Sequence, residues 1–269
     1  MSRIVTNSSA NTVYKNYSQN SAKLASSAEK LATGLRINRA SDDSAGLAIS
    51  EGMRAQVKGS DVANDNISNA VNFLNTADGY LQTVSDILGR MEELAVSNGD
   101  GTKSTTDQAN IGAEFKTLST QLAAIATGAA SPTFNGKALF SNAGLSIQTG
   151  ANSADTISLS ATDLNGSGGF AGVSAGTTTV ASVSAVQAAI AGVSTLRATM
   201  GSDQARLNYQ ASALQNYSEN ISAAESRIRN VDMAKETTNF SRYQIQVQAG
   251  TAMLAQANQL PQNVLSLLR

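Results

Sequence analysis

The sequence predicts a mainly α protein, built as a long coiled-coil rod of paired N- and C-terminal helices with a small β-hairpin region at one end. Apolar residues recur in steps of three and four over long stretches near both ends of the chain. The segment between these stretches is instead rich in Gly, Ser and Thr. The 269 residues are 41% hydrophobic but only 4% aromatic, with no Trp, which favours packed helices over a broad aromatic core.

A first helix is expected before Gly34. Its apolar register, in steps of three and four, places on one face Tyr14, Tyr17, Leu24 and Leu31, and continues to Leu35. Gly34 can end the helix because glycine accepts the left-handed cap conformation. Residues 34–46 are then expected to form an ordered connector.

Two further helices follow the connector. One is expected over residues 45–98, with a register that runs through Ala70, Phe73, Ala77, Tyr80, Val84, Ile87, Met91 and Leu94. Turn residues at 97–102 interrupt it. The next, over residues 103–127, carries Ile111, Phe115, Leu118, Leu122 and Ile125.

The middle of the chain, residues 128–181, contains few charges. Apolar and polar residues alternate over 145–160 around a Gly-Ala-Asn-Ser turn, which predicts a hairpin. Residues 165–182 are expected to form an exposed loop. Its glycines do not make a phosphate loop, because no Lys-Ser/Thr pair follows them. The Ser/Thr-rich part at 174–184 suits either a plain solvated loop or a carrier of O-linked sugars.

The longest register runs without a break from Val186 to Val231. A sustained heptad needs neighbours, and the helices at 45–98 and 103–127 are long enough to supply them. A last apolar stripe follows near the C-terminal end, at Ile245, Met253, Leu260, Val264 and Leu267. We expect it to pair with the N-terminal stripe. Since one two-helix contact buries little area, the ends should be loose in the monomer and become ordered on assembly.

Composition excludes several classes of function. The net charge is −1, with no basic stripe for nucleic acid, and no apolar run is long enough for a membrane span. His and Cys are absent, so no catalytic residue, metal site or cofactor is expected. The adjacent Asp42 and Asp43 suit an acid pair or cation site less well than helix capping. No secretory signal is evident at residues 1–16.

Five stretches of the chain carry longer motifs: LATGLRINRASDDSAGLAISEGMRAQ (31–56), ISNAVNFLNTADGYLQTVSDILGRMEELAV (67–96), FNGKALF (134–140), IQTGANSADTISLS (147–160) and SRIRNVDMAKETTNFSRYQIQVQAGTAMLAQANQLPQNVLSLLR (226–269). Together these stretches resemble bacterial flagellin. The resemblance implies a structural subunit that polymerises into the flagellar filament for motility. It also implies an extracellular location reached without a cleaved signal peptide. The implied partners are further copies of the chain and an export chaperone, with junction and cap proteins.

The resemblance also implies how the chain is divided. Residues 1–45 and 225–269 would form inner-core terminal helices, and residues 46–130 and 182–224 an outer-core helical rod. Residues 131–181 would form a small β and loop region at the filament surface. Since only about residues 165–181 stand where many flagellins carry large outer domains, we expect a slim filament. The terminal stripes become the predicted assembly seam.

Arg90, Leu94 and Glu114 match residues through which some flagellins contact a vertebrate Toll-like receptor. Arg90 and Leu94 lie one turn apart on a helix. The alternative is that Leu94 faces the helical core and Arg90 is a solvated charge. Glu92 and Ser97 depart from the receptor-binding pattern, which usually has a basic residue and Gln at these places.

Two other functions compete with the filament subunit. A hook–filament junction protein would share related terminal helices, but the hairpin and C-terminal motifs favour flagellin. A soluble enzyme or ligand-binding bundle is disfavoured by the absence of His and Cys. A flagellin with a protease insert would need an HExxH helix, and the sequence contains none.

Overall fold

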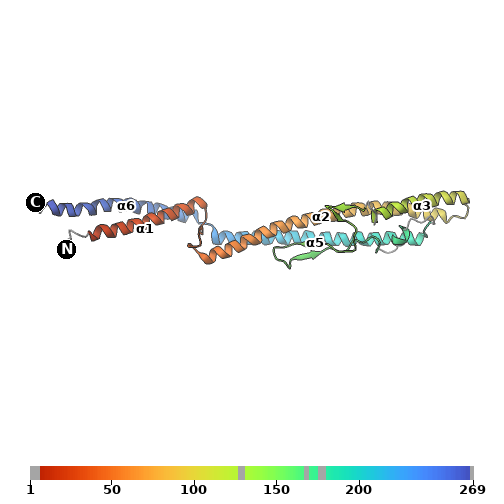
Figure 1. Ribbon diagram of the computed structural model, residues 1–269, viewed down its shortest axis with the longest axis horizontal. Coiled ribbons are helices and arrows are strands. Elements are labelled where there is room, and N and C mark those ends of the chain that lie inside the picture. The colour runs from red at the N-terminus through yellow and green to blue at the C-terminus, as the bar shows by residue number, and fades with distance from the viewer. Residues whose placement is uncertain (1–6, 127–130, 167–169, 175–179, 267–269) are drawn as a thin grey trace. The chain divides into compact units, whose positions relative to one another are not determined.

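The computed structural model describes residues 7–126, 131–166, 170–174 and 180–266, with side chains described as far as residue 259. Long helices dominate this part of the chain, and the strands are short (Figure 1). The mainly α prediction is therefore confirmed. In chain order the elements are α1 (Ser8–Thr33), α2 (Ser44–Asn98), α3 (Thr105–Ala126), β1 (Thr133–Phe134), β2 (Lys137–Ala138), β3 (Ser146–Gln148), β4 (Thr156–Ser158), α4 (Phe170–Val173), α5 (Val183–Arg229) and α6 (Met233–Ser266).

Local sequence signals set the ends of the first helices. The Asn7 side chain accepts a hydrogen bond from the backbone N–H of Ala10 at the start of α1. Gly34 follows the last residue of α1 with a φ of +70°, and its N–H donates to the carbonyl of Lys30. The predicted boundaries of α1, α2 and α3 agree with the structure to within a few residues.

Helices α2 and α5 run antiparallel and share a core. Arg197 of α5 forms an ion pair with Asp78 of α2, with 2.7 Å between Nε and Oδ1. The predicted register is buried over much of both helices, which confirms the long heptad seam in this region. Tyr80 is an exception, because its side chain is 41% exposed and its neighbour Leu81 is fully buried instead. The seam shifts by one residue there, which simple three–four counting cannot detect.

Two small hairpins lie beside α2. Strands β1 and β2 pair around Asn135 and Gly136, whose φ angles of +48° and +77° suit the Asn-Gly turn. Strands β3 and β4 pair in the predicted segment, with Ile147 opposite Ile157.

The expected place of the hairpins was wrong. Gln148 accepts a hydrogen bond from Asn66, and Phe134 packs edge-on against Phe73. The hairpins therefore flank α2 and do not cap the end of the helices where α2 turns into α3. A two-stranded hairpin is marginal alone, so it lies where its apolar side chains can join the helical core.

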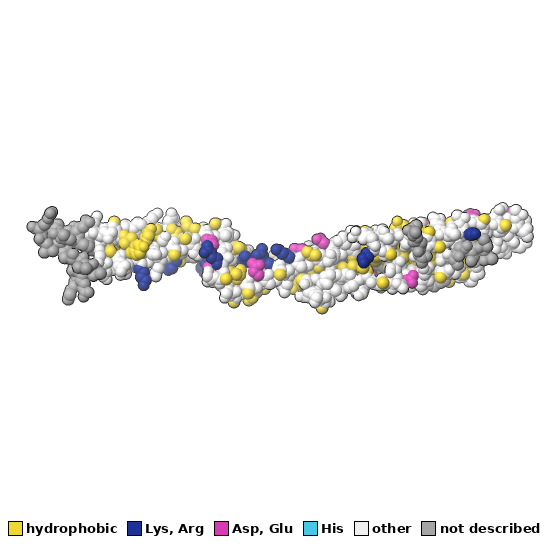
Figure 2. All heavy atoms as spheres, in the orientation of Figure 1, with side chains coloured by type: hydrophobic (Ala, Val, Ile, Leu, Met, Phe, Trp, Pro, Cys, Tyr) yellow, Lys and Arg dark blue, Asp and Glu magenta, His cyan; other side chains and the backbone are white. Residues whose placement is uncertain are grey.

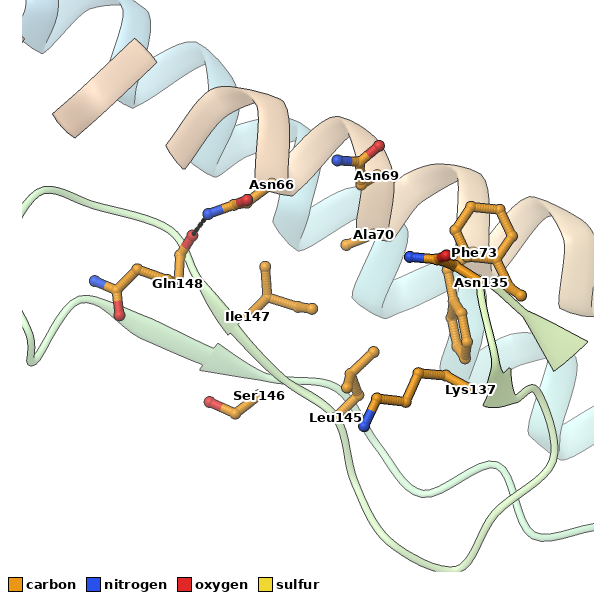
Figure 3. A pocket seen from close by; sticks show the side chains of 11 residues that line it. Asn66, Asn69, Ala70, Phe73, Asn135, Lys137, Leu145, Ser146, Ile147 and Gln148 are labelled. Carbon is orange, nitrogen blue, oxygen red and sulfur yellow. Dashed lines mark hydrogen bonds between the residues drawn. The ribbon is translucent and has the colours of Figure 1, made fainter. Parts of the chain in front are cut away.

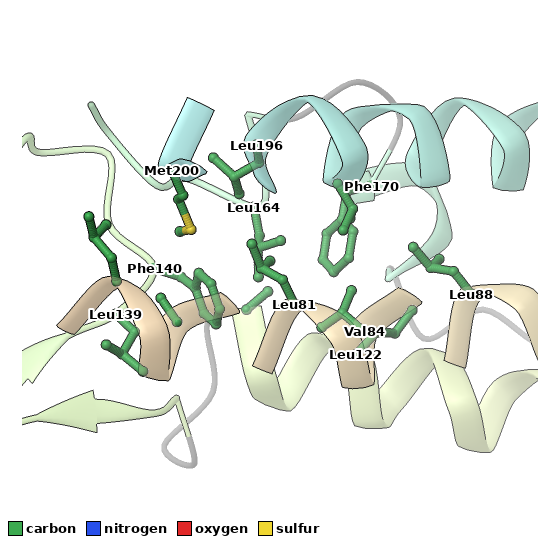
Figure 4. Packing of buried hydrophobic residues seen from close by; sticks show 14 of the residues in the cluster. Leu81, Val84, Leu88, Leu122, Leu139, Phe140, Leu164, Phe170, Leu196 and Met200 are labelled. Carbon is green, nitrogen blue, oxygen red and sulfur yellow. The ribbon is translucent and has the colours of Figure 1, made fainter. Parts of the chain in front are cut away.

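The expected exposed loop at 165–182 was also wrong in part. Phe170 and Val173 form the short helix α4 and are almost fully buried. Figure 4 shows Phe170 among Leu81, Val84 and Leu88 of α2 and side chains of other elements. The carbonyl of Val173 also accepts a hydrogen bond from the buried hydroxyl of Ser119 in α3. Because the flanking residues are rich in Gly and Ser, the composition of this segment predicted a loop and did not indicate that these two residues belong to the core.

The contacts divide the chain into two compact units. One contains residues 1–55 and 220–269, and the other contains residues 56–219. The first holds α1 and α6 with the connector, and the second holds the shared core of α2, α3 and α5 with both hairpins. The predicted three-part division, with a separate region at 131–181, remains a prediction.

Candidate assembly interface

Helices α1 and α6 pack against each other in antiparallel orientation (Figure 1). Near one end of the pair, the Asn7 side chain donates to the carbonyl of Ala257 at 2.8 Å. Near the other, the Ser27 hydroxyl donates to the Glu236 carboxylate at 2.6 Å, and Ser27 is buried. The predicted pairing of the N- and C-terminal helices is therefore confirmed.

One face of α6 makes this contact, and we call it the inner face. Gly250 lies against Tyr17, since a β-carbon at position 250 would come within 3.3 Å of the tyrosine ring. The ammonium group of Lys23 lies 6.0 Å from the centre of the Tyr243 ring. The inner face consists of half-buried or buried residues in steps of four and three: Glu236, Phe240, Tyr243, Val247, Gly250, Leu254 and Ala257.

The predicted C-terminal stripe lies on a different face of α6, which we call the outer stripe. Its described side chains are exposed and comprise Ile245, Ala249, Ala252 and Met253. Ile245 is 65% exposed and Met253 is 57% exposed. Ile245 precedes Val247 by two residues, and a helix turns about 100° per residue, so their side chains point about 160° apart.

The expectation that this stripe pairs with α1 was therefore wrong. Two registers with helical spacing coexist in α6, and the prediction followed the one with Ile245 and Met253. The inner register has the same three–four spacing. It includes Glu236, Tyr243 and Gly250, however, and a search for strongly apolar residues does not select these. Close approach at Gly250 and the Ser27–Glu236 hydrogen bond favour that face.

The other predicted seam residues divide in a similar way. Tyr17, Leu24, Leu31 and Leu35 are half-buried, whereas Tyr14 is 61% exposed and lies off the contact with α6. Figure 2 shows apolar side chains gathered on the visible face of the α1–α6 pair. The side chains of Leu260 and Val264 are not described, and Leu267 lies outside the described residues.

The connector after α1 is clamped to the junction between α5 and α6. Leu35 and Asn230 form an isolated antiparallel bridge. On either side of it, the N–H of Arg36 donates to the carbonyl of Arg229, and the N–H of Val231 donates to the carbonyl of Gly34. The predicted ordered connector is confirmed by these hydrogen bonds.

Charged side chains reinforce the same connector. The largely buried Arg229 side chain forms an ion pair with Glu51 of α2 at 2.5 Å. This hydrogen bond from Arg229 is the main cause that holds the pKa of the Glu51 carboxyl below its ordinary value. The N–H groups of Arg39 and Asn38 donate to Asp42 and lower its pKa in the same way.

Asp43 takes the capping role that the sequence favoured. It precedes α2, and its carboxylate accepts from the N–H of Gly46 at 2.9 Å. Asp42 instead holds the connector backbone. Among the residues that the structure describes, no three His, Cys, Asp or Glu side chains come together to hold a metal ion.

The predicted receptor-contact residues lie at the contact of α2 with α3. Arg90 is exposed and forms 2.8 Å ion pairs with both Glu93 and Glu114. Glu93 and then Glu114 raise the pKa of the Arg90 guanidinium. Leu94 is only 5% exposed and belongs to the core, so one of the three residues is covered within the chain itself.

A groove lies between α2 and the hairpins (Figure 3). It has a volume of about 540 Å³. Phe73, Phe134 and Ile147 contribute apolar walls, and Asn66, Asn135 and Lys137 line it with polar groups. None of the residues that line it is a His, Cys, Asp or Glu.

The helices of the described chain include none that combines the length and the apolar character needed to cross a membrane. The long apolar register of α5 is instead used for packing, because its buried residues face α2 and α3.

Both ends of the chain match models of a known protein family. Residues 4–144 match the bacterial flagellin N-terminal helical region, and residues 183–268 match the bacterial flagellin C-terminal helical region. The chain belongs to the bacterial flagellin family. The two matches cover α1 to α3 and α5 to α6, and they leave residues 145–182 between them.

Individual relatives agree with the family. This flagellin is 42% identical over 248 residues to a flagellin of Halalkalibacterium halodurans, and the match covers 90% of each chain. It is 38% identical over 298 residues to a flagellin of Bacillus subtilis, covering 96% of this chain and 97% of the relative. It is also 37% identical over 263 residues to the flagellar filament 33 kDa core protein of Treponema phagedenis, covering 90% and 91%.

These matches give the chain its function. It is a structural subunit of the bacterial flagellar filament, an extracellular appendage, and it is not an enzyme. Flagellins assemble with copies of themselves. The hook–filament junction alternative is not favoured, because the relatives are flagellins and filament core proteins.

Proposed function

We propose that the outer stripe of α6, together with the exposed Tyr14 of α1, is the surface through which this subunit contacts neighbouring copies in the filament. The proposal rests on one observation above all: α6 carries two apolar faces, and α1 covers only the inner one. An amphipathic stripe needs a second surface to bury it. In a homopolymer, the available surface is another copy of the chain.

The composition of α6 supports this role. Residues 243–266 contain no charged side chain, although a helix exposed on most of its surface would ordinarily carry several. Charge is depleted at the centres of protein interfaces because desolvation is costly there. The outer stripe also contains small side chains, since Ala249 and Ala252 lie between Ile245 and Met253. Another helix can therefore approach it closely.

We further propose that the α1–α6 pair is marginal in the free subunit and is stabilised on assembly. Its contact is one helix against one helix, and the inner face includes the polar Glu236 and the small Gly250. A single contact of this kind supplies little apolar burial. In the filament, helices of neighbouring copies would add burial on the outer stripe. A head-to-tail contact of this type does not close into a ring and so propagates.

The same loose pair suits export. We infer that the chain leaves the cell without a cleaved signal peptide and with its terminal helices unpaired. An export chaperone would then cover α6 before assembly, and junction and cap proteins would contact the same helices at the filament ends. Chaperone protection of the outer stripe from proteolysis, and its loss on adding filament seeds, would test this sequence of contacts.

The residues between the two family matches form the proposed outer surface. We infer that residues 131–181 face the outside of a slim filament without large outer domains. The match to the Halalkalibacterium halodurans flagellin runs over 248 residues and 90% of each chain, so the two chains are similar in length, which supports the short form. Surface labelling of intact filaments at Lys137 would test this arrangement, and complete protection of that lysine would contradict it.

Recognition by a Toll-like receptor is a second, separate proposal. Arg90 and Glu114 form a charged surface that a receptor could read, while the core position of Leu94 means that this residue could act only by supporting it. Charge reversal at Arg90 should weaken receptor activation if the surface is read directly. Unchanged activation by that variant would count against the proposal.

Elongation of filament seeds tests the assembly surface. Ile245→Asp places a charge in the outer stripe, and Gln244→Asp places the same charge on an exposed neighbouring position outside it. We expect Ile245→Asp to stop elongation and Gln244→Asp to leave it within about twofold. Equal elongation by both variants would overturn the proposed surface. Circular dichroism of both monomers controls for loss of helix.

A further inference from the structure

The methionines of the described chain fall into buried and exposed groups. Met91 and Met200 are buried in the helical core, and Met53 is half-buried. Met233 and Met253, both in α6, are 50% and 57% exposed. A thioether on the surface can meet oxidants in solution, whereas the core thioethers are shielded by their neighbours.

Met253 differs from Met233 in where it lies on the helix. Met253 follows Ala249 by one turn and adjoins Ala252, so it belongs to the outer stripe. Met233 lies at the start of α6, where its neighbours Asp232 and Lys235 are exposed and charged. Among the methionines that the structure describes, Met253 alone combines an exposed side chain with a place on the proposed assembly surface.

We propose that Met253 is an oxidation site that controls whether a free subunit can join the filament. This inference rests on the proposed role of the outer stripe. Hydrogen peroxide is the class of oxidant considered. A lone pair of the thioether sulfur attacks one peroxide oxygen, the S–O bond forms and the O–O bond breaks. The other oxygen leaves as water after proton transfer, so that sulfur loses two electrons and the peroxide gains them.

The product changes the chemistry of the stripe. Methionine sulfoxide is polar, chiral and a strong hydrogen-bond acceptor in place of a flexible apolar group. Ile245 and Met253 are the two large apolar side chains among the described residues of the outer stripe. Oxidation would thus remove one of two anchors and bury an oxygen without a donor in the contact. Methionine sulfoxide reductases reverse the reaction.

Assembly should in turn protect the site. In the free subunit Met253 is open to solvent, and in the filament a neighbouring copy would cover it. Oxidation would then remove free subunits from assembly while leaving existing filament intact. Met91 sets the rate expected for a covered thioether, and Met233 in the free subunit sets the rate for an open one.

The experiment uses the full chain with untreated filament seeds. Monomer and filament are exposed to hydrogen peroxide, and sulfoxide at each methionine is followed by peptide mass spectrometry. We expect Met253 to oxidise at least tenfold faster in the monomer than in the filament. We also expect oxidised monomer to elongate seeds at least tenfold more slowly, and reductase treatment to restore the rate.

Two variants assign the effect to the residue. Met253→Leu keeps an apolar side chain of similar volume, so it should elongate seeds both before and after peroxide treatment. Met233→Leu should lose elongation on treatment as the parent chain does. If Met253→Leu proves unable to assemble at all, partly oxidised parent chain decides the matter: elongation should fall in step with sulfoxide at Met253 and not with sulfoxide at Met233.

The outcomes separate this inference from the proposed function. If Met253 is protected in the filament but its sulfoxide elongates at the untreated rate, the oxidation control is wrong and the assembly surface stands. If Met253 oxidises equally fast in monomer and filament, the outer stripe is not covered and both proposals fall. Equal loss of elongation by oxidised Met253→Leu would place the sensitivity at another residue and overturn the inference.

Discussion

Single polar residues hold the elements of this flagellin in place. Asp203 lies on the buried register of α5 between Met200 and Leu207, where a hydrophobic residue would be usual. Its carboxylate accepts from the backbone N–H of Ser160, two residues after the end of β4, and pairs with Arg206. The β3–β4 hairpin is thus tied to α5 through one buried carboxylate. Asp203 falls on the predicted register from Val186 to Val231, but the spacing does not indicate this hydrogen bond.

Removing that carboxylate should destabilise the unit of residues 56–219. Asp203→Ala leaves the N–H of Ser160 without its acceptor, and we expect a loss of about 1–3 kcal/mol of unfolding free energy. Asp203→Asn keeps an oxygen acceptor of similar size and should lose less. Urea unfolding of the two variants measures the difference. Equal destabilisation would show that the charge, and not the hydrogen bond to Ser160, is what matters.

The connector should respond to acid. Arg229 lowers the pKa of Glu51, and backbone N–H groups lower the pKa of Asp42. A lowered pKa in the folded state means that the ionised group stabilises above its unfolded pKa, about 4 for these residues. That stabilisation is lost as the pH falls through the lower folded values.

Glu51→Gln should therefore lower the thermal midpoint of the unit of residues 1–55 and 220–269 at pH 7. The gap from the parent chain should close below about pH 4, where Glu51 begins to be protonated in the unfolded chain. Thermal melts from pH 7 to pH 2 measure the gap. A constant gap across this range would mean that the Arg229–Glu51 pair contributes nothing that depends on charge. Glu93→Gln, at another exposed ion pair, is the matched control.

At the scale of elements, α6 shows what periodicity can and cannot determine. The sequence predicted a C-terminal helix and its pairing with the N-terminal helix, because both carry long three–four registers. It could not choose between two registers in α6, since the choice depends on close approach at Gly250 and on hydrogen bonding at Glu236. Both are properties of the pair, and neither is a property of one helix alone.

Close approach at Gly250 can be tested directly. A β-carbon added there would lie 3.3–3.8 Å from atoms of Tyr17, so Gly250→Leu should overpack the contact and cost about 1–3 kcal/mol. Gly250→Ala gains about 1 kcal/mol of helix propensity. This gain should offset the crowding of Tyr17 by the methyl group, which is smaller than the crowding by leucine. Thermal melting followed by circular dichroism compares the two. A leucine variant as stable as the alanine variant would contradict the observed packing.

At the scale of the whole molecule, sequence and structure agree best where the family matches run. Boundaries of the long helices and the α2–α5 seam followed from heptads and capping residues. The clearest error lies in residues 145–182, between the two matches. Phe170 and Val173 enter the core there from a Gly-rich segment. Their burial depends on contacts with α2 and α3, which the local sequence does not encode.

The place of the hairpins was missed for a related reason. Alternation around the Gly-Ala-Asn-Ser turn predicted the β3–β4 pair, but pairing says nothing about where a hairpin docks. The contacts that decide it join residues far apart in the chain, such as Phe134 with Phe73. The same holds for the candidate assembly interface. The sequence predicted the helices α1 and α6, but it did not predict which of their faces are in contact.

The most direct test of the central claim is thiol labelling of Ile245→Cys in monomer and in filament. The chain contains no cysteine, so the label reports on one position. We predict fast labelling of the monomer and at least tenfold slower labelling of the filament, because a neighbouring copy covers the outer stripe. Val247→Cys, on the inner face, should label slowly in the filament and gives the rate for a covered site. Equal labelling of Ile245→Cys in both forms would contradict the account.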